Sequence, residues 1–132
     1  MAEFKYTILY VEDVKAALSF YEKAFGFTTK FITPDDSYGE LNLGETTLSF
    51  AAKTLAKSNL KDGFIESNLK NKPFGIEIGF TTDNVEATVN TAVEAGATIV
   101  EYPKTSSWGQ VIAYVRDPDG FLLEICTPIS AQ

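Results

Sequence analysis

The feature that most limits the fold of this 132-residue chain is a repeat within its own sequence. Residues 5–11 and residues 75–81 both show the composition and spacing that predict a β-strand. Apolar residues at helical spacing follow each strand. The first helix is expected to start after Asp13 as its N-cap, and the second is expected to start within Asp83-Asn84-Val85-Glu86, which has the pattern of a capping box. Strand and helix therefore occur twice in the same order.

The remaining part of each copy agrees as well. Ser37-Tyr38-Gly39-Glu40-Leu41 and Ser107-Trp108-Gly109-Gln110-Val111 share an aromatic-Gly-polar triplet that is expected to lead into a strand, and a turn and a last strand follow each. Placing Tyr6 over Glu77 aligns the copies. The sequence thus predicts one α+β domain of two βαβββ modules, at about residues 4–51 and 74–128, with a linker at about 52–73.

Charge and composition exclude several classes of partner. The formal net charge is −7, and a field of this sign repels phosphate backbones and anionic membranes, so we expect neither nucleic acid nor a membrane as partner. No apolar run approaches the roughly 20 residues that span a bilayer, and the first residues lack the features of a secretory signal. The protein is therefore expected in the cytoplasm.

The absence of histidine is the most informative chemical feature of the chain. Without an imidazole, the chain can form no Ser-His pair and can offer no imidazole to a metal. Cys126 is the only cysteine, so no intrachain disulfide is possible. We expect Cys126 to be a buried structural thiol rather than a reactive one.

Two stretches of the chain resemble a known family. The first is Tyr6-Thr7-Ile8-Leu9-Tyr10-Val11-Glu12-Asp13-Val14, followed by Ser19-Phe20-Tyr21 and Phe25-Gly26-Phe27. The second is Val115-Arg116-Asp117-Pro118-Asp119-Gly120-Phe121-Leu122-Leu123-Glu124. Their order and spacing are similar to those of the vicinal oxygen chelate superfamily, which includes glyoxalases, bleomycin resistance proteins and extradiol dioxygenases. The resemblance implies curved mixed sheets that enclose a small-molecule cavity, with helices on the convex sides.

The resemblance also implies four positions for metal ligands, which fall on Tyr6, Ser49, Glu77 and Glu124 in this sequence. A phenol, a hydroxyl and two carboxylates suit zinc, nickel or ferrous iron poorly, because these metals favour imidazole in their first shell. A divalent cation such as Mg²⁺ or Mn²⁺ could accept Glu77 and Glu124, although two carboxylates bind it weakly. We therefore favour no metal and no cofactor.

Two carboxylates that face one cavity need a compensating charge, because buried like charges raise each other's pKa. A cationic ligand could supply that charge. Alternatively, Glu77 pairs with a nearby Lys or Arg, such as Arg116, and only ties strands together. Aromatic rings along the strands could stack on a planar or cationic ligand. The residues expected to bind the ligand are Tyr6, Tyr38, Ser49, Glu77, Trp108, Tyr114 and Glu124.

Three functions remain open from the sequence. The first is a small-molecule binding protein, similar to the drug-sequestering branch of the family, that holds a planar or cationic organic molecule. The second is a metal-dependent lyase or isomerase of the glyoxalase type that uses Glu77 and Glu124. The third is a metal-free enzyme in which Glu77 or Glu124 abstracts a proton while Tyr6 stabilises the oxyanion. The resemblance further implies a homodimer, with cavities that in many members combine modules from both chains.

Overall fold

The computed structural model describes residues 1–129, and the chain divides into two compact units. Unit 1 comprises residues 1–66, and unit 2 begins at residue 67. Each unit contains a four-stranded sheet and a helix that packs on it. Within residues 1–129, no helix has both the length and the apolar character that crossing a membrane requires.

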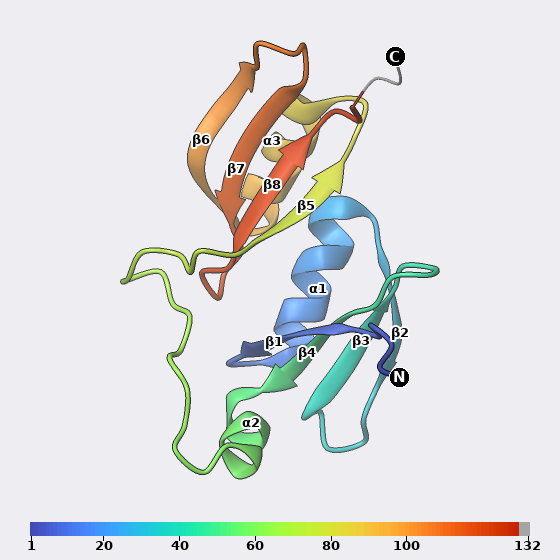
Figure 1. Ribbon diagram of the computed structural model, residues 1–132, viewed down its shortest axis with the longest axis vertical. Helices are drawn as coiled ribbons and strands as arrows, with labels where there is room; N and C mark the ends of the chain where they lie inside the picture. Colours follow the sequence, from blue (N-terminus) through green and yellow to red (C-terminus); the bar gives the residue numbers. More distant parts are fainter. Residues whose placement is uncertain (130–132) are drawn as a thin grey trace. The chain divides into compact units, whose positions relative to one another are not determined.

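Unit 1 contains one βαβββ module followed by a short helix (Figure 1). Its sheet has the order β1-β4-β3-β2, in which β1 and β4 are parallel and the other neighbours are antiparallel. The elements are β1 (Thr7–Val11), α1 (Val14–Phe25), β2 (Thr28–Ile32), β3 (Tyr38–Asn42), β4 (Leu48–Ala52) and α2 (Lys53–Asn59).

Unit 2 repeats this arrangement in the yellow to red part of the chain (Figure 1). Its sheet has the order β5-β8-β7-β6, again with the first and last strands parallel. The elements are β5 (Glu77–Thr81), α3 (Val85–Ala95), β6 (Thr98–Thr105), β7 (Val111–Arg116) and β8 (Leu122–Cys126). The predicted α+β class and the duplicated βαβββ unit are confirmed.

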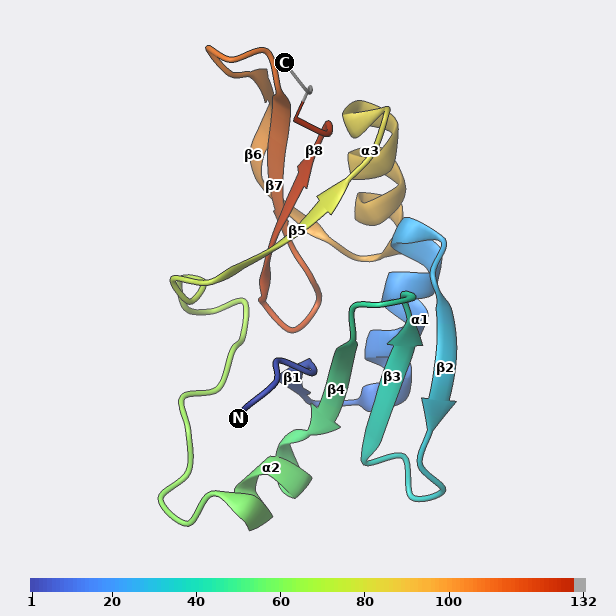
Figure 2. The same cartoon turned by 45° about the vertical axis from the view of Figure 1, so that its right-hand side comes forward.

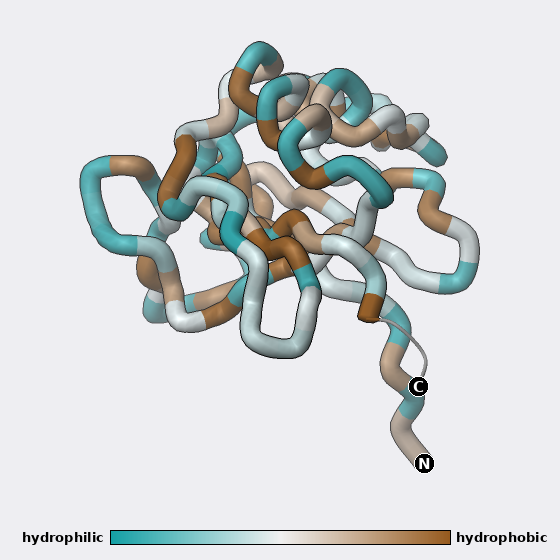
Figure 3. Tube along the Cα trace, turned by 90° about the horizontal axis from the view of Figure 1, so that it is seen from above, coloured by the Kyte–Doolittle hydropathy of each residue, from teal (hydrophilic) through white to brown (hydrophobic). Residues whose placement is uncertain are grey.

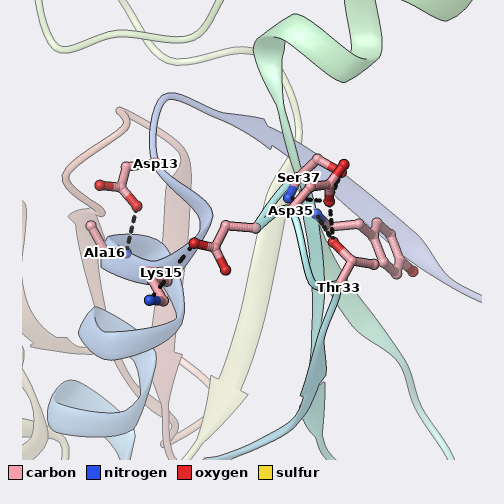
Figure 4. Close-up of polar contacts among 8 residues, drawn as sticks. Asp13, Lys15, Ala16, Thr33, Asp35 and Ser37 are labelled. Carbon is pink, nitrogen blue, oxygen red and sulfur yellow. Dashed lines mark hydrogen bonds and ion pairs between the residues drawn. The ribbon is translucent and has the colours of Figure 1, made fainter.

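The capping residues explain where the two long helices begin. Asp13 Oδ1 accepts a hydrogen bond from Ala16 N at 3.1 Å, as the sequence predicts (Figure 4). In α3 the N-cap is Asn84, whose Oδ1 accepts from Ala87 N at 3.0 Å, so the predicted capping box led by Asp83 is wrong by one residue. Asn84 has the extended backbone that an N-cap needs, and its side chain accepts the hydrogen bond from the free amide of Ala87.

In unit 1, the side chains along the strands alternate between an apolar face and the opposite face, which we call the open face. Helix α1 covers one face of this sheet (Figure 2). Leu9, Val11 and Phe50 are buried on that face, where the Tyr21 and Phe50 rings lie 5.1 Å apart. Gly39 also faces α1, and a Cβ there would lie 2.8 Å from Leu18 Cδ1. The neighbouring strand positions point to the opposite face, because side chains alternate along a strand.

Unit 2 follows the same alternation. Leu123 and Ile125 of β8 and Ala113 and Val115 of β7 are fully buried, whereas the intervening positions are polar or partly exposed. Helix α3 contributes buried apolar residues to this core. Figure 3 colours the trace by hydropathy, and brown and teal stretches alternate along it. The helix-covered faces therefore hold the cores, and the open faces carry both polar and apolar side chains.

Strand register tests the alignment of the two copies. Ile8 pairs with Ser49 in unit 1 and Gly79 pairs with Glu124 in unit 2, which agrees with the alignment of Tyr6 on Glu77 and of Ser49 on Glu124. Tyr6 itself precedes β1 and is 54% exposed, so the predicted strand begins later than expected.

The proposed equivalence of Tyr38 and Trp108 is wrong. Tyr38 lies in β3 opposite Ala51, and the corresponding pair in unit 2 is Ile112 and Cys126. Trp108 lies instead in the turn between β6 and β7 and is 66% exposed. The triplets resemble each other locally, but pairing across the sheet sets the register, and it shifts them apart.

The end of unit 1 is held by charges and rings. The Lys53 ammonium, whose side chain is 12% exposed, lies 3.4 Å from a Glu12 oxygen and 3.3 Å from a Glu66 oxygen. The rings of Tyr10 and Phe64 meet edge to face at 4.8 Å. These contacts fasten the segment after α2 to β1 and α2.

The beginning of unit 2 is held by a buried arginine. The Arg116 guanidinium donates to the carbonyl oxygens of Gly120 (2.9 Å), Asn71 (2.8 Å) and Asn68 (3.0 Å). Gly120 completes the arrangement, because its φ is +92° and a Cβ there would lie 2.7 Å from the carbonyl carbon of Asn68. Close approach and backbone conformation both require glycine at this turn.

We expect Gly120→Ala to lower the free energy of unfolding more than Gly109→Ala does. Both glycines have a φ of +92°, but a Cβ at Gly109 meets nothing within 4 Å. The left-handed conformation costs each alanine roughly 1–2 kcal/mol, and only position 120 adds a backbone clash. Urea unfolding measures both variants, and equal losses would contradict the role assigned to the close approach to Asn68.

Candidate functional site

The open face of unit 2 brings two carboxylates together. Glu77 begins β5, and Glu124 lies on β8 beside Gly79, so parallel pairing puts both acids on the same side of the sheet. Gly79 leaves room between them, since a Cβ there would lie 3.4 Å from Glu124 Oε1. Tyr114 pairs with Glu124 from β7 and completes the group. We call Glu77, Tyr114 and Glu124 the acid pair cluster.

The Tyr114 hydroxyl connects the two acids. Its oxygen lies 3.3 Å from Glu124 Oε2 and 3.5 Å from Glu77 Oε1, and it donates to either. Both distances are long for bonds between a hydroxyl and a carboxylate, which are usually about 2.5–2.7 Å. Because a hydroxyl has one hydrogen, it can answer only one carboxylate at a time.

The pKa values in the cluster reflect two negative charges close together. Burial raises the pKa of Glu77 first, the charge of Glu124 raises it further, and the Tyr114 hydroxyl opposes both effects. Burial and the two carboxylates raise the pKa of Tyr114 to about 12. Tyr114 is therefore a protonated donor at neutral pH.

Cys126 lies at the edge of the cluster and is buried, as expected. Its Sγ is 3.5 Å from Glu124 Oε1 and 3.8 Å from the Phe80 carbonyl oxygen. Burial, followed by the charge of Glu124, raises the pKa of the thiol. The thiol therefore acts as a weak donor to Glu124 rather than as a nucleophile.

The alternative that Arg116 neutralises Glu77 is wrong. Its guanidinium is engaged by the three carbonyl oxygens named above, which lie in the segments that precede β5 and follow β7. Across residues 1–129, neither Glu77 nor Glu124 has a basic side chain within ion-pair distance. The two acids are thus held together without a cation from the chain.

The open face of unit 1 carries a different cluster. Tyr38 Oη donates to Glu40 Oε2 at 2.6 Å, and the Tyr38 and Ser49 hydroxyl oxygens lie 2.9 Å apart. Ser49 is fully buried. Burial and the Glu40 carboxylate raise the pKa of Tyr38, whereas the Ser49 hydroxyl opposes this effect.

The turn before β3 fixes the position of Tyr38. Asp35 Oδ1 accepts hydrogen bonds from Thr33 Oγ1 at 2.8 Å, Ser37 N at 3.1 Å and Ser37 Oγ at 2.7 Å (Figure 4). These donors lower the pKa of Asp35. Tyr38 N donates in turn to Thr33 Oγ1 at 3.2 Å. The turn therefore fixes Tyr38, the first residue of β3.

The structure gathers most, but not all, of the predicted site residues. Glu77, Tyr114 and Glu124 lie together in unit 2, and Tyr38 and Ser49 lie together in unit 1. Trp108 is held in its turn, where Nε1 donates to Gln110 Oε1 at 2.8 Å and Gln110 Nε2 donates to the Thr127 carbonyl oxygen at 2.8 Å. The exposed Tyr6 has no hydrogen bond within the described chain.

Sequence reasoning missed Glu40 and Gln110. Glu40 stands two residues after Tyr38, and this spacing puts both side chains on one face of a strand, so the signal was present. Gln110 had no such signal, because its role depends on the hydrogen bonds that it makes to Trp108 and Thr127.

The residues at the four family positions do not fit a transition metal. Tyr6 and Ser49 offer a phenol and a hydroxyl in unit 1, and Glu77 and Glu124 offer two carboxylates in unit 2. Over the described part of the chain, no three acidic or cysteine side chains gather in a group that could hold a metal ion. Without imidazole, this donor set suits zinc, nickel or ferrous iron poorly.

Comparison with known proteins agrees with this architecture. Residues 3–125 match the Glyoxalase/Bleomycin resistance protein/Dioxygenase superfamily, so the chain belongs to that superfamily, as the resemblance predicted. The virulence protein STM3117 of Salmonella typhimurium is 27% identical over 122 residues, which are 89% of this chain and 78% of that protein.

Solved structures agree with the fold. A glyoxalase-related enzyme from Fulvimarina pelagi has a TM-score of 0.81 at 18% identity, covering 97% of this chain and 89% of that one. A glyoxalase/bleomycin resistance protein/dioxygenase family enzyme from Burkholderia phytofirmans has a TM-score of 0.79 at 22% identity, covering 96% and 98%. At such identities the likeness establishes the fold, whereas function depends on the site.

We expect Glu124→Gln to lower the pKa of Glu77 towards its ordinary value, because the substitution removes the neighbouring charge that raises it. Carboxyl-detected NMR titration of the labelled protein measures the shift. Glu40→Gln in unit 1 is the matched control and should leave Glu77 unchanged. An unchanged Glu77 pKa in the Glu124→Gln variant would contradict the coupling of the two acids.

The raised pKa also gives stability a pH dependence. Between the ordinary pKa of 4.5 and the raised value, the folded protein binds more protons than the unfolded chain, so the contribution of Glu77 to stability is lost as pH rises. We therefore expect Glu77→Gln to gain stability relative to the native protein between a pH below 4.5 and neutral pH. Urea unfolding of both proteins at both pH values tests this, and a stability difference that does not change with pH would contradict it.

Proposed function

We propose that this protein binds a small organic cation, with a planar group where the ligand has one, and that it does so without a transition metal. The acid pair cluster forms the subsite that binds the cationic group of the ligand. The observation that carries the proposal is that Glu77 and Glu124 share one hydroxyl donor and have no cation of their own within the described chain. A ligand ammonium would relieve the repulsion that raises the pKa of Glu77.

Unit 1 adds a second surface of similar chemistry. Tyr38, Ser49 and the exposed Tyr6 offer aromatic and hydroxyl groups on or beside the open face, and Glu40 adds a carboxylate whose charge is already answered by Tyr38. These groups suit contact with the polar and planar parts of a ligand. Trp108, at an exposed turn, is a reporter of binding as well as a candidate contact.

Membership of the superfamily supports small-molecule binding as the general activity. We further propose a cytoplasmic homodimer, since members with two modules usually form dimers. Sedimentation of the native protein over a range of concentrations tests the dimer, and a monomer at all concentrations would contradict it.

We expect the protein to bind phenethylammonium and not 3-phenylpropionate, which has a similar shape and the opposite charge. Glu77→Gln should weaken phenethylammonium binding about tenfold, because a hydrogen bond to a charged group contributes about 1.5–3 kcal/mol. Calorimetry and Trp108 fluorescence measure the affinities. Glu86→Gln, which removes the same charge from α3, should bind as the native protein does. Equal binding of both probes would contradict the proposal.

The metal-free part of the proposal has its own test. Elemental analysis of the natively purified protein should find no stoichiometric zinc, nickel or iron. Mg²⁺ or Mn²⁺ added at millimolar concentration should leave phenethylammonium affinity within about twofold, since two carboxylates hold such ions weakly. Stoichiometric bound transition metal that is lost in Glu77→Gln would favour the glyoxalase-type alternative instead.

A further inference from the structure

A hollow lies in unit 2 between β6 and β7. Its volume is about 280 Å³, and its lining includes Tyr102, Ile112 and Tyr114. It forms where β6 departs from regular pairing, because the register with β7 shifts between Ile99 and Glu101 and again between Glu101 and Lys104. Unit 1 has one such shift between its corresponding strands, so the second irregularity is particular to unit 2.

Sequence explains why the strand is irregular at this point. Pro103 falls inside the second shift and has no amide hydrogen to donate to β7. The extra residues of a bulge bend the strand and redirect its side chains. The hollow thus lies where the backbone of β6 is irregular.

Tyr114 belongs to both the hollow and the acid pair cluster. Its side chain lines the hollow, and its hydroxyl oxygen contacts Glu77 and Glu124. A ligand group in the hollow would therefore lie one tyrosine ring away from the two carboxylates. The two features form a continuous surface within one unit.

The lining indicates what the hollow can accept. Its walls are mainly apolar, and Glu101 and Lys104 carry opposite charges that leave no net charge there. A dry cavity of about 150 Å³ is large enough for benzene, and ligand pockets usually begin at about 300 Å³. A volume of about 280 Å³ therefore suits one aromatic ring with a short substituent.

We propose that the hollow is the ring-binding subsite of this protein and that the ligand is an arylalkyl amine. The ring lies against Tyr114 and Ile112, and a short alkyl chain carries the ammonium to Glu77 and Glu124. This inference rests on the proposed function for the cationic end and adds the class of molecule that the site selects. In this proposal, the bulge in β6 gives the protein its preference for an aromatic ligand. None of the site residues predicted from the sequence lies in that bulge.

The test compares two cations that differ in the ring. The native protein should bind phenethylammonium about tenfold more tightly than n-butylammonium, because only the first buries an aromatic ring. Ile112→Phe fills the hollow and should abolish this preference, so that the two cations bind with about equal affinity. Ile129→Phe, the same substitution at an exposed position outside the hollow, should retain the preference.

A second variant guards against a folding defect. Thr105→Phe also fills the hollow from an exposed strand position, and circular dichroism verifies that it folds. Equal affinity for the two cations in the native protein, or a preference that survives in both filled variants, would overturn the ring subsite while leaving the proposed function intact. If neither cation binds the native protein, the proposed function itself fails.

Discussion

The parallel pairing of the first and last strands of each unit is the constraint on which the candidate site depends. Parallel neighbours cannot be joined by a tight turn, and in each unit the long connection between them begins with a helix that covers one face of the sheet. The other face carries both polar and apolar side chains. In unit 2 the same pairing sets Gly79 beside Glu124, with Glu77 two residues earlier on the same face. The closeness of the two acids is therefore a property of the backbone.

The two units use one framework for different chemistry. Register makes Ser49 the counterpart of Glu124, and Glu40 the counterpart of Tyr114. On the open face of unit 1, Glu40 accepts a short hydrogen bond from Tyr38. On the open face of unit 2, Glu77 and Glu124 share the longer hydrogen bond of Tyr114. The negative charge that lacks a basic partner is concentrated in unit 2. That asymmetry is why the proposed cation-binding subsite lies there.

Local signals in the sequence predicted what local physics decides. Alternation, helical spacing and the Asp13 cap predicted the strands and helices, and the family resemblance implied that Glu77 and Glu124 face one cavity. The errors arose where distant segments decide. Trp108 shares a triplet with Tyr38, but cross-strand pairing places it in a turn. Arg116 is close to acidic residues in the sequence, yet its partners are carbonyl oxygens 45 and 48 residues away and one in the adjoining turn.

The crossover between the two sheets is divided between the units. Lys53 and Phe64 fasten its first part to unit 1 through Glu66 and Tyr10, and the Ser67 hydroxyl donates to the Asp119 carbonyl oxygen at 2.9 Å in unit 2. The anchored residues Glu66 and Ser67 are neighbours, so a single peptide bond separates them. Each duplicated half has therefore kept its own share of the connecting chain, and cutting that bond would leave each of these three contacts within one fragment.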